Sequence, residues 1–154
     1  MRRRLRSFGL LAIAPLLLLT LAAQSRSSQS IWDEIYKSAW AGIYTDDQAA
    51  RGQAGYRARC ASCHGIALEG SDEGPPLAGR DFAEDWNCAN IADLFEKIQF
   101  TMTGSRSSQL SEQQVADILS YILKMNQFPA GGRMLPANVD DLRGLLFFAR
   151  NPLQ

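Results

Sequence analysis

The stretch Cys60-Ala61-Ser62-Cys63-His64 decides the fold of this 154-residue chain. It has the form C-x-x-C-H, which is the attachment signature of a c-type haem. Two thiols at this spacing can each form a thioether with a vinyl group on one edge of the macrocycle. His64 then lies under the ring and can give its imidazole to the iron. The motif therefore predicts one haem c, covalently bound through Cys60 and Cys63 and ligated by His64.

A C-x-x-C pair also occurs in redox dithiol proteins and in zinc sites. A zinc site needs two further soft ligands, but the chain has only one other cysteine, Cys88, and one histidine, His64. A thioredoxin-like dithiol would lie in a strand–helix–strand pattern, which the sequence around the motif does not show. Haem attachment is therefore favoured, with the dithiol and zinc interpretations as alternatives.

The N-terminus has the three parts of a secretory signal peptide. A region with four arginines precedes an apolar run over residues 10–21, and Ala22-Ala23 leads into polar residues. Cleavage near Ala23 would place the protein in the periplasm, where bacteria attach haem c. A membrane span needs about 20 apolar residues, and the apolar run over residues 10–21 is shorter than this. We therefore expect no stable membrane span after cleavage. An uncleaved N-terminal anchor is the alternative.

Charge and cysteine count limit the partners. The chain carries 16 basic and 16 acidic residues, and loss of the four leader arginines leaves 12 against 16. This balance does not favour binding to nucleic acid or to an anionic membrane surface. If haem occupies the other two cysteines, Cys88 has no disulfide partner within the chain. We expect it to be a buried, inert thiol, with a link to another protein as the alternative.

Helical periodicity and end signals predict two main helices. Thr45 suits the N-cap of a helix over residues 46–59, which leads into the haem motif. Ser111 and Gln114 match a capping box at the start of a helix over residues 112–125.

Shorter helices are expected over residues 91–100 and 140–150. Residues 31–44 carry aromatic side chains at roughly helical spacing, which we expect to pack on the domain. Residues 65–79 are rich in glycine and proline, and a haem edge could organise such a long loop. No period-two pattern indicates strands, so the predicted fold class is all-α.

The sixth iron ligand has to be something other than histidine, because His64 is the only one. Methionine is the usual alternative. Met125 ends an apolar helical stripe and is expected to pack in the core, whereas Met134 follows a Gly-Gly turn. Met102 lies in a loop between two helices, and a loop can curl over the far face of a haem. The metal ligands are therefore predicted to be His64 and Met102.

Together these elements resemble the class I, monohaem cytochromes c. The shared elements are the C-x-x-C-H motif, residues 74–79, Met102 and the apolar face of the helix over residues 112–125. Other stretches are similar to the small cytochromes and cytochrome domains associated with quinoprotein (PQQ-dependent) alcohol dehydrogenases. These stretches are residues 42–45, 48–52, 110–111 and 126–131, together with Trp86.

The resemblance implies a class I cytochrome c fold, with a few short helices wrapped around the haem. Together with the leader, it divides the chain into a signal peptide (1–23), an N-terminal extension (24–45), a cytochrome c domain (46–135) and a C-terminal extension (136–154). It also implies that two helices cross where four residues meet: Gly52, Tyr56, Ile118 and Tyr121.

The resemblance assigns further residues to the haem. The Pro75 carbonyl should accept a hydrogen bond from Nδ1–H of His64, which orients the imidazole. Leu77 should line the haem pocket. Arg80 and Trp86 are expected near a haem propionate, with ordinary packing at the domain edge as the alternative.

One position departs from the family pattern. The relatives usually have Met-Pro where this chain has Met102-Thr103. Threonine restores a backbone N–H and frees the φ angle that proline fixes. We therefore expect a more mobile loop and a weaker iron–sulfur bond.

The expected function is electron transfer by an exported carrier that turns over no substrate. Its expected partners are redox proteins, such as a quinoprotein dehydrogenase on one side and a terminal oxidase or another cytochrome on the other. One alternative is a haem subunit of a quinoprotein dehydrogenase complex. Another is a ligand-binding or catalytic haem protein, if Met102 does not hold the iron.

Overall fold

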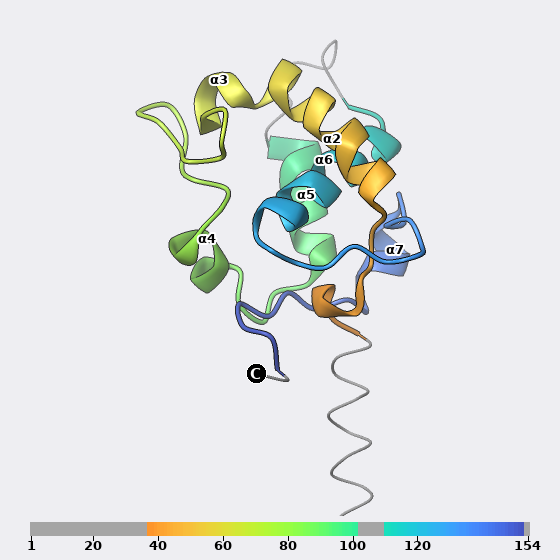
Figure 1. Cartoon of the computed structure of the whole chain (residues 1–154). Coiled ribbons are helices and arrows are strands. Elements are labelled where there is room, and N and C mark those ends of the chain that lie inside the picture. The colour runs from red at the N-terminus through yellow and green to blue at the C-terminus, as the bar shows by residue number, and fades with distance from the viewer. Residues whose placement is uncertain (1–36, 102–109, 153–154) are drawn as a thin grey trace, which may run out of the picture. The chain divides into compact units, whose positions relative to one another are not determined.

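The computed structural model describes residues 37–101 and 110–152, which lie in one compact unit. These residues form helices and two isolated β-bridges, with no strand among them, so the all-α prediction is confirmed (Figure 1). The predicted signal peptide lies outside the described residues. The elements are a 3-10 helix η1 (Ala39–Ala41) and helices α2 (Asp46–Arg59), α3 (Ala61–His64), α4 (Arg80–Asp85), α5 (Ile91–Thr101), α6 (Glu112–Met125) and α7 (Val139–Leu142).

Helix α2 has the predicted bounds and leads directly into the haem motif. The Thr45 side chain caps its start by accepting a hydrogen bond from the backbone N–H of Gln48, at 3.2 Å. Acidic residues occupy its first turn and basic residues its last turn, which matches the helix dipole at both ends. The helix ends at Arg59, so Cys60 follows at its C-cap.

Helices α2 and α6 cross in close contact, as the resemblance implied (Figure 1). A Cβ atom built on Gly52 would lie 1.8 Å from the backbone oxygen of Asp117, so the two backbones meet without a side chain between them. One turn later, the rings of Tyr56 and Tyr121 pack with centroids 5.5 Å apart. The crossing therefore depends on a glycine at position 52.

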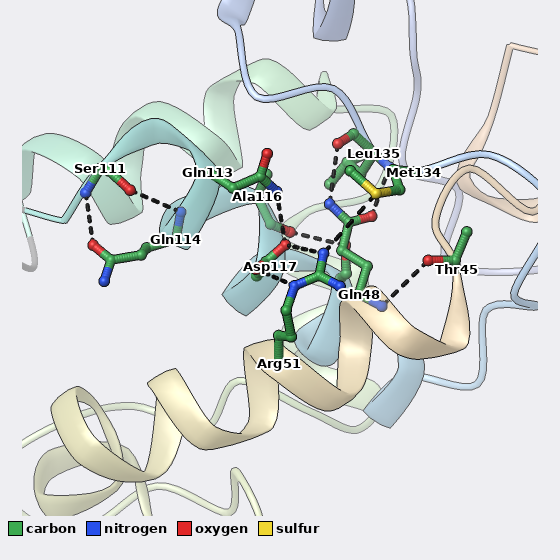
Figure 2. Close-up of polar contacts among 11 residues, drawn as sticks. Thr45, Gln48, Arg51, Ser111, Gln113, Gln114, Ala116, Asp117, Met134 and Leu135 are labelled. Atoms are coloured by element: carbon green, nitrogen blue, oxygen red, sulfur yellow. Dashed lines mark hydrogen bonds and ion pairs between the residues drawn. The ribbon is translucent and has the colours of Figure 1, made fainter.

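An ion pair closes one side of this crossing (Figure 2). Arg51 of α2 contacts both carboxylate oxygens of Asp117 on α6, Nε to Oδ2 at 2.9 Å and Nη2 to Oδ1 at 3.0 Å. Gln113 donates a further bond to Oδ1 at 2.8 Å. The Asp117 side chain is largely buried, whereas the Arg51 side chain is half-exposed. The bidentate geometry makes this pair stronger than an ordinary surface ion pair.

Helix α6 also has its predicted bounds, and both bonds of the predicted capping box are present. The Ser111 hydroxyl accepts from the Gln114 backbone N–H at 3.3 Å, while the Gln114 side chain accepts from the Ser111 N–H at 2.9 Å (Figure 2). Helix α5 ends at Thr101, one residue beyond the prediction, and its apolar face is buried.

The prediction of the last helix was wrong in its C-terminal part. The helix expected over residues 140–150 ends at Leu142, because the backbone beyond it pairs with distant segments. Leu146 N–H donates to the Lys37 carbonyl at 2.7 Å, and Phe147 N–H donates to the Ala89 carbonyl at 2.9 Å. Helix α4, which has six residues and lies between the haem motif and α5, was not predicted.

The segments on either side of residues 46–135 pack together and complete the core. Ala39 N–H donates to the Leu146 carbonyl at 2.9 Å, and the Trp40 indole N–H donates to the Phe148 carbonyl at 2.8 Å. Phe128 lies between the Trp40 and Phe147 rings, with centroids 4.6 and 4.8 Å away. The expected aromatic packing of residues 31–44 therefore holds for its described part.

No helix among residues 37–101 and 110–152 is long and apolar enough to cross a membrane.

The buried tyrosines predict a loss of stability at alkaline pH. The Tyr44 hydroxyl donates to the Phe128 carbonyl at 2.6 Å, and burial, with a smaller effect of Asp46, raises the pKa of Tyr44 from 10.0 to about 12. Burial also raises the pKa of Tyr56. As the pH rises above 10, the tyrosine hydroxyls ionise in the unfolded chain before they ionise in the folded chain. The stability that these neutral hydroxyls contribute is therefore lost as the pH rises through the folded-state pKa.

We therefore expect the free energy of unfolding to fall between pH 10 and 12, and to fall less in Tyr44→Phe, which has no hydroxyl to ionise. Urea unfolding followed by circular dichroism at several pH values measures both slopes. Equal slopes in the two proteins would contradict the assignment to Tyr44.

Candidate haem site

The C-x-x-C-H motif is wound into one helical turn directly after α2. Cys60 N–H donates to the Tyr56 carbonyl at 2.8 Å, and His64 N–H donates to the Cys60 carbonyl at 2.9 Å. Positions four residues apart share a helix face, so this turn brings Cys60 and His64 to the same side. Cys60 is half-buried, Cys63 is exposed, and His64 is only 8% exposed.

The imidazole of His64 is oriented by the loop that follows it. Its Nδ1 lies 2.7 Å from the Pro75 carbonyl oxygen, which is the contact that the resemblance implied. A carbonyl can only accept, so Nδ1 carries a proton, and in the neutral imidazole Nε2 then keeps a free lone pair. A Cβ atom on Gly74 would lie 3.0 Å from Nδ1 and Cε1 of the ring, so glycine lets this backbone approach the imidazole.

Hydrogen bonds hold the start and the middle of this loop, which spans residues 65–79, close to the motif. The Tyr56 hydroxyl donates to the Gly65 carbonyl at 2.7 Å, and Ser71 Oγ donates to the Cys63 carbonyl at 2.6 Å. The fully buried Leu68 accepts from Leu77 N–H at 2.9 Å. Neither the Tyr56 hydroxyl nor Ser71 was predicted to be part of the site.

The other predicted haem-binding residues lie farther along the chain. Leu77 is half-buried and packs against the core. Arg80 begins α4 with its side chain 81% exposed, and its Nε lies 2.8 Å from Glu84 Oε1. Trp86 is the C-cap of α4 and packs on Phe82, with ring centroids 6.3 Å apart. Proximity of Arg80 and Trp86 to a propionate therefore stays a prediction.

The methionines are placed as follows. Met102 belongs to residues 102–109, which lie outside the described part of the chain. Met125 is partly buried and packs against the core, as expected. Met134 is 52% exposed, with its sulfur 4.0 Å from Arg51 Nη2.

The expectation of a buried Cys88 was wrong, because this cysteine is exposed. It lies in a turn after α4 with a positive φ of 67°. Its backbone N–H donates to the Phe147 carbonyl at 2.8 Å, which holds the turn against the C-terminal segment.

The donor set fits a haem better than the alternatives. It offers a buried imidazole with a fixed tautomer, and two thiols that form no disulfide. Burial raises the pKa of the Cys60 thiol, against a smaller lowering by Arg59, whereas reactive dithiols depend on a lowered thiol pKa. Among the described residues, no group of three His, Cys, Asp or Glu side chains could hold a metal ion.

Comparison with known families agrees with this assignment. Residues 47–122 match the model of the family described as "Cytochrome C oxidase, cbb3-type, subunit III". No curated protein and no solved structure gives a significant match. The family match supports a class I c-type cytochrome domain over these residues, and such a domain implies haem c and electron transfer.

Proposed function

We propose that this protein is a monohaem cytochrome c that carries single electrons between exported redox proteins. Cys60 and Cys63 would bind the haem covalently, and His64 Nε2 and Met102 Sδ would be its axial ligands. The observation that carries the proposal is the C-x-x-C-H turn, with His64 held by the Pro75 carbonyl at 2.7 Å. No bond in a substrate is made or broken, so the protein would be a carrier and not an enzyme.

The chain's own residues would orient the iron ligand and shield it. When bound, haem supplies a one-electron ferric/ferrous couple. The Pro75 carbonyl holds the Nδ1 proton, which makes the imidazole a more basic ligand through Nε2. The His64 side chain is itself shielded from water, because the residue is only 8% exposed. Because Cys63 is exposed, the edge attached to it would lie at the surface, where a partner could exchange electrons.

The proposed partners follow from the resemblance and the leader. A signal peptide over residues 1–23 would export the chain to the periplasm, where quinoprotein dehydrogenases operate. Such a dehydrogenase would be the donor, and a terminal oxidase or another cytochrome would be the acceptor. Encounters of electron carriers are typically small and transient.

One sequence feature favours a second candidate function. Thr103 follows Met102 where proline is usual, and threonine frees the φ angle that proline fixes, so we expect a weaker iron–sulfur bond. If Met102 leaves the iron, the sixth position is open, and the protein would bind a small ligand or act in redox catalysis. A permanent haem subunit of a dehydrogenase complex would differ from the carrier only in how long its partner stays bound.

Replacing Met102 with alanine tests the proposed ligation. We expect the ferric wild-type protein to show the weak far-red charge-transfer band of methionine-ligated haem, and Met102→Ala to lose it. Met134→Ala is the matched control, because Met134 lies on the surface, and it should keep the band. Visible spectra of protein made with the haem-attachment machinery give the result.

A band that survives in Met102→Ala, or that is missing from the wild type, would refute ligation by Met102. Rapid binding of carbon monoxide by the reduced wild type would instead favour the second candidate function.

A further inference from the structure

The side chain of Asn126, the C-cap of α6, binds the loop that orients His64. Its Nδ2 donates to the Leu77 carbonyl and to the Ile122 carbonyl, both at 2.9 Å. Its Oδ1 accepts from Gly79 N–H at 3.1 Å. One amide thus uses both of its donor hydrogens and its acceptor to join the end of α6 to residues 77–79.

The backbone that Asn126 holds is close to the contact on His64. Leu77 follows Pro75 and Pro76, and proline fixes φ at each of these two residues. A displacement of Leu77 would therefore also move the Pro75 carbonyl, because the two prolines cannot rotate about φ to compensate. This carbonyl lies 2.7 Å from His64 Nδ1.

We propose that Asn126 is a positioning residue for the iron ligand: by fixing Leu77 and Gly79 it places the Pro75 carbonyl on His64 and so tunes the bound haem. This inference rests on the proposed function. A well-placed carbonyl increases the basicity of the imidazole, and a more basic ligand stabilises the ferric state. Loosening the loop should weaken this effect and raise the midpoint potential.

The test compares Asn126→Ala with Ser111→Ala in the haem-loaded protein. Ser111 caps the opposite end of the same helix, so its loss destabilises α6 without touching residues 65–79. We expect Asn126→Ala to raise the midpoint potential, and Ser111→Ala to leave it unchanged. Amide hydrogen exchange gives a second measurement: Gly79 N–H should exchange roughly tenfold faster in Asn126→Ala, as for the loss of an ordinary hydrogen bond.

Each outcome decides a separate claim. An unchanged or lowered midpoint potential in Asn126→Ala, or an equal rise in Ser111→Ala, would overturn the positioning role of Asn126. The proposed function as a haem-binding electron carrier would be unaffected by this result. A wild-type chain without attached haem would overturn the proposed function. If Asn126→Ala does not fold, Asn126→Leu keeps most of the volume, removes all three bonds, and is expected to raise the potential in the same way.

Discussion

Replacing Gly52 with alanine is expected to lower the free energy of unfolding by about 3 kcal/mol, near the upper end of the usual cost of overpacking. The added Cβ would lie 1.8 Å from the backbone oxygen of Asp117. Backbone atoms cannot rotate away, so α2 and α6 would have to separate. Alanine also favours the helix by about 1 kcal/mol relative to glycine, which is too little to compensate.

Gly55→Ala is the matched control for this prediction. It gains the same helix propensity, but the nearest atom to its new Cβ is in the flexible Ile118 side chain, at 3.1 Å. We therefore expect its stability to stay within about 1 kcal/mol of the wild type. Thermal and urea unfolding of both variants measure the difference. Similar losses in the two variants would mean that the helix crossing does not depend on close backbone contact at Gly52.

Replacing Cys60 and Cys63 together with serine is expected to abolish covalent haem attachment completely. Serine cannot form a thioether, and this pair supplies both proposed links. Each single variant should keep one link and attach less haem. The measurement is haem staining after denaturing electrophoresis, supported by the intact mass of each protein.

Cys88→Ser is the control for the cysteine pair. Cys88 is exposed, and the haem proposal gives it no role, so this variant should carry as much haem as the wild type. Loss of haem from Cys88→Ser, or covalent haem in the double variant, would show that the attachment sites were assigned wrongly.

The parts of the fold that local interactions determine could be predicted from the sequence. Helices α2 and α6 begin where predicted because their N-caps, Thr45 and Ser111, each accept a hydrogen bond from a backbone N–H only three residues later. The crossing at Gly52 was implied by resemblance, and the structure confirms it. The motif at residues 60–64 could be identified because covalent haem attachment requires that spacing.

The parts that depend on tertiary contacts could not be predicted. The apolar residues after Leu142 favour a helix locally, but the backbone of Leu146 pairs with Lys37 instead. Helix α4 has one buried residue, Phe82, which gives no periodic pattern to recognise. Two of the three hydrogen bonds of Asn126 join residues that are 47 and 49 positions apart in the sequence. No local sequence pattern predicts such long-range pairs.

A redox titration of the wild-type protein, followed by visible spectroscopy, tests the central claim most directly. We predict one covalently bound haem that titrates as a single one-electron step, with no binding of carbon monoxide to the reduced form. This result would fit a carrier whose iron has His64 and a second protein ligand. Absence of a haem spectrum, or ready formation of a carbon monoxide complex, would contradict the electron-carrier account.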